Sequence, residues 1–496
     1  MGIIVKQSIK GTIWSYLGVG VGFITTAYLF PNYLDPDAIG LFGLLLAWSL
    51  VLTQFASLGF AGITTRMFPW FRNKEVGHNG FLFIAFMVMT AGFIIFLATY
   101  FIFAPWLAEN NLEKSQLFSE YIYLLIPLTF FTLLFTILDT YNRLIYDTVF
   151  GTFLSEFLQR LLILVVFLLF IFGLINLHQL ILTYAAAVCV KGAVIFFYLF
   201  LNGEIDLRPR PGFITKDLRN EMLSVGIFSI LTGFGGNLVF SLDKIIINQM
   251  LGLDATGVYT IAFFFGTLVI IPSRPLLRIS GTLIADAWKR EDVPYIADIY
   301  KKSCLNQFIM GAFLFGGIWV NINSILIILG PEYEAGKWVI FFIGLSYLID
   351  MATGANSQII AFSKYYKMAL WFLIILLVLV IINMYLLIPL WGIAGAAVAI
   401  AVSFFLNNLM RFVFLYHKYH LQPYTAHFLF VVVSFLPAYY LAYMLPELPL
   451  VWDILARGSA FALVYLVLII GLKASSDVNI TLVKIVKQLA ALVNKK

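Results

Sequence analysis

Long apolar runs separated by short polar breaks repeat along nearly the whole chain. A helix needs roughly 20 residues to cross the hydrocarbon core of a bilayer, and most runs reach that length. The breaks carry charged residues, Pro or Gly, which is typical of the ends of membrane helices. The pattern predicts fourteen spans, namely 11–31, 40–64, 80–104, 120–142, 148–174, 179–201, 222–250, 255–284, 303–329, 338–362, 368–389, 392–416, 425–445 and 452–473.

The composition supports this prediction. Hydrophobic residues make up 62% of the 496 residues and charged residues only 11%, whereas a soluble domain carries about 25% charged residues. So few charges could not cover the surface of a soluble protein of this length, which excludes a soluble enzyme. The expected fold class is an all-α polytopic membrane protein with about 14 transmembrane helices.

Lysine and arginine set the expected orientation. If the N-terminus is cytoplasmic, the inner segments hold 23 of the 31 basic residues, and the outer loops hold only Lys114 and Lys337. Positive charge concentrates on the cytoplasmic side of membrane proteins, so both termini are predicted to be cytoplasmic. The net charge of +6 is then accounted for by topology, and no nucleic-acid partner is predicted.

Two turns indicate an internal repeat. Residues 34–42 read LDPDAIGLF and residues 251–259 read LGLDATGVY, and aligned without a gap the two stretches are identical at four of nine positions. The first follows span one and the second follows span seven. An even number of spans per repeat gives both halves the same orientation, so we expect two six-helix lobes related by a pseudo-twofold axis along the membrane normal.

The expected organisation follows from this repeat. Residues 1–201 form the N-terminal lobe, 202–221 a cytoplasmic linker and 222–416 the C-terminal lobe. Two additional transmembrane helices occupy 417–473. The tail, 474–496, has apolar residues at helical spacing with lysines on the other side, which is typical of an interfacial amphipathic helix.

Charged residues inside the predicted spans are the candidates for function, because a cation at the centre of a membrane helix costs about 2.5–3.5 kcal/mol. The cations that could bind an anionic substrate in a cavity are Lys244, Arg274, Arg160, Lys191 and Arg278. The acids that could couple an ion or form an ion pair are Asp243, Asp350 and Glu156. A structural ion pair remains the alternative for each. Asp139, Arg143 and Arg457 lie near span ends, where snorkelling explains them.

The local patterns differ in what they favour. Asp243 and Lys244 are adjacent and diverge by about 100° around a helix, so at least one needs a partner elsewhere. Arg274 lies between Pro272 and Pro275, which predicts a kinked helix carrying a guanidinium suited to phosphate oxygens. Glu156 and Arg160 are spaced i, i+4, which favours a self-contained pair.

The sequence predicts no cofactor and no metal centre. The five histidines form no metal-ligand cluster, and no phosphate-binding Gly-rich loop with a Walker lysine is present, so ATP-driven transport is not expected. Coupling to H⁺ or Na⁺ remains open.

The chain resembles the polysaccharide-export flippases of the multidrug/oligosaccharidyl-lipid/polysaccharide exporter superfamily, and most closely its O-antigen and capsule repeat-unit flippases. The resemblance rests on the arrangement of six, six and two spans, the turn at 254–259, the preceding Asp243-Lys244 pair and the PLWGIAGAA run from Pro389. It implies movement of undecaprenyl-pyrophosphate-linked oligosaccharide from the inner to the outer leaflet of a bacterial inner membrane by alternating access. It also implies membrane lipid, polysaccharide polymerase and glycosyltransferases as partners.

Other functions stay open. A lipid II flippase also has fourteen spans and cavity arginines, although the arginine of its first span is missing here. A multidrug or cation antiporter of the same superfamily often uses an acid in span one, and 11–31 contains none. From another class, a membrane-embedded polysaccharide polymerase or glycosyltransferase is the alternative, but such enzymes usually carry a larger aqueous segment than this chain offers.

Overall fold

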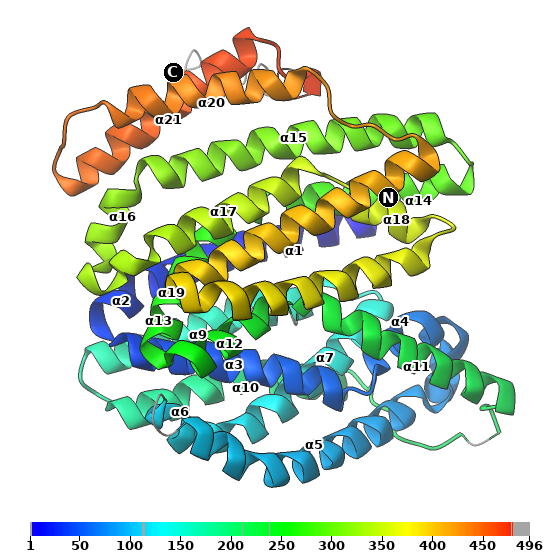
Figure 1. Ribbon diagram of the computed structural model, residues 1–496. Helices are drawn as coiled ribbons and strands as arrows, with labels where there is room; N and C mark the ends of the chain where they lie inside the picture. The colour runs from blue at the N-terminus through cyan, green and yellow to red at the C-terminus, as the bar shows by residue number, and fades with distance from the viewer. Residues whose placement is uncertain (1, 112–114, 211, 238, 478, 480–496) are drawn as a thin grey trace, which may run out of the picture. The chain divides into compact units, whose positions relative to one another are not determined.

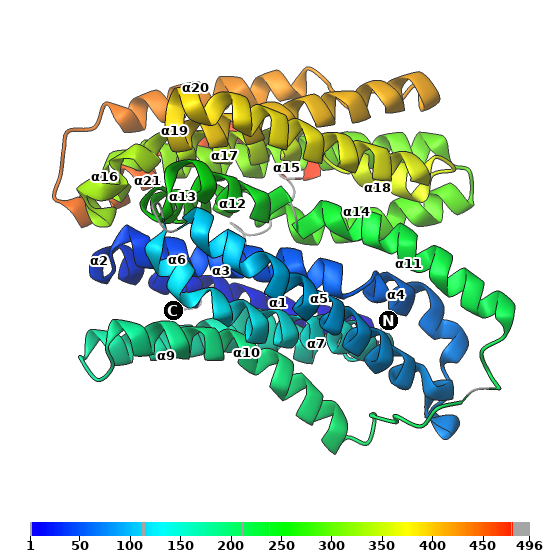
Figure 2. The same ribbon diagram turned by 60° about the horizontal axis from the view of Figure 1, so that its bottom comes forward.

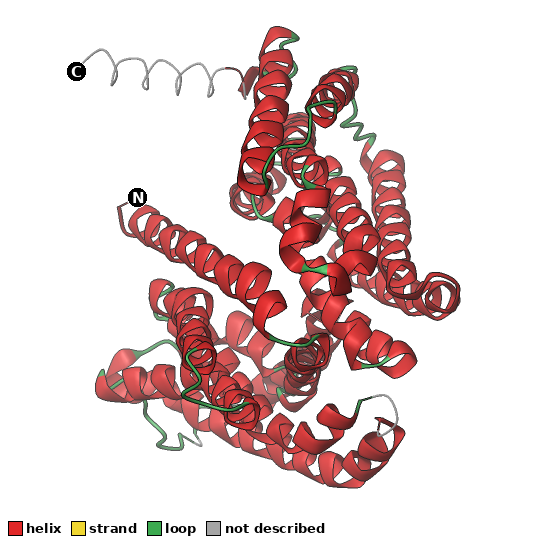
Figure 3. Ribbon diagram, turned by 90° about the vertical axis from the view of Figure 1, so that its left-hand side faces the viewer, coloured by secondary structure: helices red, strands yellow, loops and turns green. Residues whose placement is uncertain are grey.

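The computed structural model describes residues 2–111, 115–210, 212–237, 239–477 and 479 (Figure 1). Every regular element in these residues is a helix, and Figure 3 draws only helices and loops for them. The all-helical prediction is confirmed.

The first of two compact units comprises Met1–Thr260. Its core is aromatic, since the rings of Phe60, Phe68 and Phe71 lie 5.5, 5.2 and 5.1 Å from that of Phe81, and all four side chains are fully buried. Its helices are α1 (Gly2–Gly22), α2 (Phe30–Tyr33), α3 (Pro36–Ala56), α4 (Phe60–Phe71), α5 (Phe81–Asn111), α6 (Gln116–Tyr121), α7 (Leu125–Leu144), α8 (Val149–Thr152), α9 (Gln159–Ile171), α10 (Leu177–Leu201), α11 (Lys216–Asn237), α12 (Val239–Leu251) and the start of α13 (Leu253–Thr267).

The second unit comprises Ile261–Lys496. In it α20 and α21 pack on each other and on α15 (Figure 1), and Phe461 and Tyr465 are buried at their junction. The two additional C-terminal helices predicted from the sequence are thus formed and packed. The helices that begin in this unit are α14 (Ser273–Lys289), α15 (Val293–Val320), α16 (Ile322–Leu329), α17 (Lys337–Ala352), α18 (Asn356–Phe362), α19 (Tyr366–Tyr419), α20 (His427–Tyr443) and α21 (Leu450–Gly471).

All fourteen predicted spans fall on helices, but the correspondence is not one to one. Within the described residues, 11 helical segments are long and apolar enough to cross a membrane. One of them, α19, has 54 residues and contains two predicted spans, which are divided at Gly392. Its φ of 56° and ψ of −137° form a backbone bend that favours glycine. The count of fourteen is therefore approximate.

The two compact units are defined by contacts between helices, whereas the two predicted lobes are defined by the sequence repeat, so their bounds differ. Helices α11 and α12 belong to the second predicted lobe, yet they pack on α4 and α3 of the first unit. The lobe bounds therefore remain a prediction. Most of the predicted amphipathic tail, 474–496, lies outside the described residues.

The two repeat turns contact each other through glycine. A Cβ atom on Gly40 would lie 2.3 Å from the carbonyl oxygen of Leu253, and one on Gly257 would lie 1.9 Å from that of Pro36. The alignment of the two turns pairs Gly40 with Gly257 and Pro36 with Leu253, so the contact is reciprocal, as a local twofold axis requires. Only glycine permits this approach of backbone to backbone.

We predict that Gly257→Ala destabilises the protein by about 1–3 kcal/mol, because the added methyl group meets a backbone carbonyl that cannot rotate away. The matched control is Gly20→Ala, since no atom lies within 4 Å of a Cβ placed there. The thermal midpoint of the purified protein in detergent, followed by tryptophan fluorescence, should fall for Gly257→Ala only. Equal midpoints for the two variants would contradict the close contact.

Candidate functional site

Glu156 and Arg160 form an ion pair on the fifth predicted span. Arg160 Nη2 lies 2.9 Å from Glu156 Oε2, and Arg160 Nη1 donates to the carbonyl oxygen of Gly18 on α1 at 3.0 Å. The Arg160 and Glu156 side chains keep 32% and 30% of their surface exposed. The predicted ion pair is therefore formed. Because about a third of each side chain is exposed, a ligand can still contact both groups.

Two π-helical segments flank this ion pair. η1 (Phe23–Leu29) continues α1, and η4 (Phe153–Leu158) precedes α9 and contains Glu156. η4 packs on α1, and η1 packs on α9. A Cβ on Gly18 would lie 1.9 Å from the carbonyl oxygen of Glu156, so glycine lets the two helices meet. π-Helical turns occur frequently at functional sites.

Lys191 on α10 adds a third charge to this part of the unit. Its ammonium lies 5.2 Å from the centre of the Phe135 ring, and both Glu156 and Asp139 are within electrostatic range of it. Figure 2 shows α7, α9 and α10 side by side, and α10 packs on both of the others. The structure thus brings together Glu156, Arg160 and Lys191.

Asp139 on α7 is a charged residue whose role the sequence did not reveal. It is 4% exposed, its Oδ2 accepts from Arg143 Nε at 2.9 Å, and its Oδ1 has no hydrogen-bond partner among the described residues. Gly151 admits the carboxylate, since a Cβ there would overlap Oδ1. The sequence predicts snorkelling at a span end for Asp139 and Arg143, whereas the structure pairs them, and the proximity to Lys191 depends on helix packing.

Asp243 and Lys244 lie on α12. Asp243 is fully buried, and its Oδ2 accepts from the hydroxyl of Tyr259 at 2.9 Å. Tyr259 is the last residue of the second repeat turn, so this bond joins α12 to α13. Lys244 is half-buried beside it. The geometry gives Asp243 a structural partner, and Lys244 remains a candidate for ligand binding.

The eighth predicted span is interrupted where its prolines lie. Helix α13 ends at Thr267, a short 3₁₀ segment covers Leu268–Ile270, and α14 begins at Ser273. The predicted break at Pro272 is therefore present. It places Arg274 in the first turn of a new helix, as in the discontinuous helices that form transporter binding sites.

Helix α14 carries an exposed polar stripe. Arg274, Arg278, Thr282 and Asp286 follow at i+4 spacing and are exposed, whereas Ile284 on the opposite face is buried. Among the described residues, neither guanidinium group finds an ion-pair or hydrogen-bond partner. Both arginines fall within the predicted span 255–284, but the apolar segment of the structure that could cross the membrane ends at Ile270, so the two groups lie just beyond it.

Asp350 on α17 lies in a polar network of the second unit. Its Oδ1 accepts from Asn408 Nδ2 at 3.0 Å, and Asn408 Oδ1 accepts from Thr353 Oγ1 at 3.0 Å and Asn356 Nδ2 at 2.9 Å. Arg411 is within electrostatic range of Asp350. The sequence singled out the acid but assigned Arg411 to topology, and the amides carry no charge signal.

The network has a counterpart in the first unit. The alignment of the two repeat turns, continued along the chain without a gap, pairs Asp139 with Asn356 and Lys191 with Asn408. The first unit therefore holds a charged pair of side chains where the second holds two hydrogen-bonded amides. This correspondence rests on the offset of 217 residues alone, and the repeat beyond the two turns remains a prediction.

The cations suit a phosphate-bearing ligand. Arginine presents a planar fork of donors that matches phosphate oxygens, and lysine adds a point charge. Each unit offers such groups: Arg160 and Lys191 in the first, and Arg274 and Arg278 in the second. Within the described residues, no group of three or more His, Cys, Asp or Glu side chains could hold a metal ion.

The chain is similar in structure to a flippase and to multidrug transporters. "Lipid II flippase MurJ, inward closed conformation" superposes with a TM-score of 0.72 at 13% identity, over 94% of this chain and 98% of that chain. An inward-facing multidrug resistance MATE family transporter of the MOP superfamily gives 0.65 at 16% identity, over 82% and 94%. At these identities the likeness shows the fold alone, and it confirms the predicted all-helical membrane fold.

Sequence comparison gives the family. No curated protein matches the chain. The profile of the family described as "Polysaccharide biosynthesis protein" matches residues 5–279, which is more than half of the 496 residues. The chain, a polytopic membrane protein with a transporter fold, therefore belongs to the polysaccharide biosynthesis protein family.

Proposed function

We propose that this protein is a flippase that moves undecaprenyl-pyrophosphate-linked oligosaccharide repeat units from the inner to the outer leaflet of the bacterial inner membrane, with both termini in the cytoplasm. The observation that carries the proposal is the exposed pair Arg274 and Arg278 on a helix of a predicted span. Membership in a polysaccharide family supports a glycan as the cargo.

The charge of the site favours an anionic cargo. The exposed or half-buried cations outnumber the acids beside them, because Glu156 is paired with Arg160 while Arg274 and Arg278 have no acidic partner among the described residues. A drug-like organic cation would meet repulsion there, whereas a pyrophosphate would gain charge-assisted hydrogen bonds. The prenyl tail would remain in the surrounding lipid.

The mechanism we infer is alternating access. Cytoplasm-open lobes admit the head group, the cations hold the pyrophosphate, and rocking of the lobes exposes the sugars outside. The contact between the repeat turns at Gly40 and Gly257 joins residues of both predicted lobes. It lies at the predicted outer end of the spans, so an outward opening has to separate it.

An ion gradient is the proposed energy source, because the chain carries no nucleotide-binding motif. Glu156 and Asp350 are candidates to carry the coupling H⁺ or Na⁺, and Asp243 is less suited because it is fully buried against Tyr259. Polysaccharide polymerase and glycosyltransferases, which use or make the cargo, are the proposed partners.

Depletion of the protein tests the function directly. In a host without a second flippase, a flippase defect leaves lipid-linked repeat units on the inner leaflet, protected from an externally added glycosidase. A polymerase defect instead leaves single repeat units on the outer leaflet, where the glycosidase cleaves them. Accumulation on the outer leaflet after depletion would overturn the proposal in favour of the enzyme.

We predict that Arg274→Ala lowers the rate of export about tenfold or more, the effect of losing a hydrogen bond to a charged group. Arg274→Lys should be intermediate, because it keeps the charge but loses the fork. Lys289→Ala, which removes an exposed cation from the last turn of the same helix, is the matched control. Surface polysaccharide is measured at equal protein level in the membrane, and full export by Arg274→Ala contradicts the assigned role.

We predict that Arg160→Gln and the double variant Glu156→Gln/Arg160→Gln lose export equally. If Arg160 served only to neutralise Glu156, removing both charges would restore function, since a neutral amide pair would replace the ion pair. If Arg160 binds the pyrophosphate, neutralising its partner cannot replace it. The measurement is surface polysaccharide per membrane-inserted protein, and recovery in the double variant would show a purely structural pair.

A further inference from the structure

A pocket of about 430 Å³ lies in the second unit, where three separate parts of the chain converge. Lys301, Lys302 and Asn306 come from α15, Thr425 and His427 from just before and at the start of α20, and residues 473–477 and 479 follow α21. The orientation predicted from the sequence puts all three on the cytoplasmic side. The export site proposed above uses none of these residues.

The chain turns sharply to build the pocket. Lys473 has a φ of 51°, in the left-handed region, shortly after α21 ends. Ala474 and Ser475 are buried behind it, and Ser475 Oγ donates to Asn306 Oδ1 at 2.6 Å. Asn306 Nδ2 in turn donates to Asp477 Oδ2 at 3.2 Å. These bonds hold the segment after α21 against α15.

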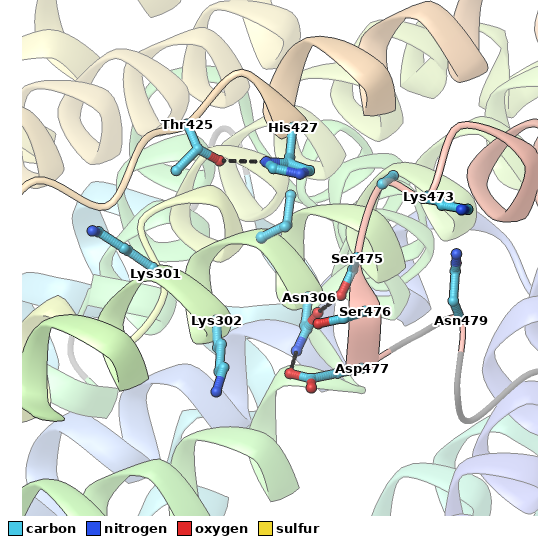
Figure 4. A pocket seen from close by; sticks show the side chains of 12 residues that line it. Lys301, Lys302, Asn306, Thr425, His427, Lys473, Ser475, Ser476, Asp477 and Asn479 are labelled. Atoms are coloured by element: carbon cyan, nitrogen blue, oxygen red, sulfur yellow. Dashed lines mark hydrogen bonds between the residues drawn. The ribbon is translucent and has the colours of Figure 1, made fainter.

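The charges around the pocket leave a cationic surplus. Lys302 is paired with Asp298 at 2.8 Å, and Asp477 is held by Asn306. Lys301 and Lys473 are exposed, and their ammonium groups form no ion pair or hydrogen bond with a described residue. In Figure 4 the lysines lie around the edge of the group, and Asn306, Ser475 and Ser476 lie nearer its centre.

The surrounding surface favours a lipid over a soluble anion. Directly beyond His427, α20 exposes Leu429, Val432 and Val433, and α21 exposes Leu463 and Val467 on the way to Lys473. Acyl chains could lie along these apolar faces while the head group enters the pocket. Basic pockets between membrane helices on the cytoplasmic side bind anionic lipid head groups.

We propose that this pocket binds the phosphate head group of an anionic phospholipid of the inner leaflet. Lys301 and Lys473 contact the phosphate oxygens, and the hydroxyl groups of Thr425 and Ser476 offer further hydrogen bonds. Such a lipid would tie together the cytoplasmic ends of α15, α20 and α21.

Native mass spectrometry of the full-length protein in detergent tests the proposal. Phosphatidylglycerol should bind more tightly than zwitterionic phosphatidylcholine, and Lys301→Gln/Lys473→Gln should weaken its binding about tenfold or more. Lys301→Arg/Lys473→Arg should retain binding, which separates lost charge from misfolding. The matched control, Lys364→Gln/Lys367→Gln, removes two exposed lysines from another predicted cytoplasmic turn and should bind as the unmodified protein does.

Three results would overturn the proposal. Equal binding of the two phospholipids would show that the pocket does not select an anionic head group. Equal loss in the pocket and control variants would show a diffuse effect of surface charge. Glycerol 3-phosphate or inorganic phosphate, if it competed as well as phosphatidylglycerol, would identify a soluble ligand. None of these results bears on glycan export, so the two proposals fail separately.

Discussion

The hydrocarbon core of a bilayer holds no water, so a charge inside it must find its partner within the protein. Most charges of this chain obey that constraint through the nearest available turn. Among the described residues, ion pairs with i, i+4 spacing inside predicted spans or at their ends join Asp139 to Arg143, Glu156 to Arg160, and Asp453 to Arg457. Longer-range partners satisfy Asp243 and Asp350, through Tyr259 and Asn408. Against this background Arg274 and Arg278 stand out, because neither forms an ion pair with an acid among the described residues.

The same constraint explains how much the sequence alone could predict. The helices followed from apolar runs, and the break before Arg274 followed from two prolines, because both depend on local chemistry. The pair of Glu156 and Arg160 also followed from its i, i+4 spacing, whereas snorkelling at span ends, rather than pairing, was the expectation for Arg143 and Arg457. The proximity of Asp139 to Lys191, far apart in the sequence, did not, since it depends on how α7 packs on α10. The π-helical segments beside Glu156 also left no signal in the residue types, because an inserted residue changes the direction of side chains without changing their composition.

The sequence identified the charged candidate residues, but it did not predict which of them lie together in one site. Scarcity of charge selected them, and this selection needs no knowledge of packing. Knowledge of helix packing is needed, however, to say which candidate residues lie close together. Glu156, Arg160 and Lys191 do so in the first unit, whereas Asp243 is bonded to a tyrosine of its own helical hairpin. Arg411 is one of the 23 basic residues counted on the inner side, and a cation near a cytoplasmic turn satisfies the positive-inside rule equally well whether it faces water or an interior carboxylate.

The predicted repeat allows buried polar groups of the two units to be compared. It pairs Asp139 with Asn356 and Lys191 with Asn408, so both units have polar residues at the paired positions. The hydrogen bonds and charges around these residues differ between the units. The amides Asn356 and Asn408 are hydrogen-bonded to each other, and Asn408 also donates to Asp350, which has Arg411 within electrostatic range. Their counterparts Asp139 and Lys191 are charged, and one carboxylate oxygen of Asp139 has no hydrogen-bond partner among the described residues. A neutral, satisfied pair responds little when a proton or an anion arrives, whereas a charged and incompletely satisfied one changes its energy strongly. The first unit therefore differs from the second in holding an incompletely satisfied carboxylate, that of Asp139, among its described buried polar groups.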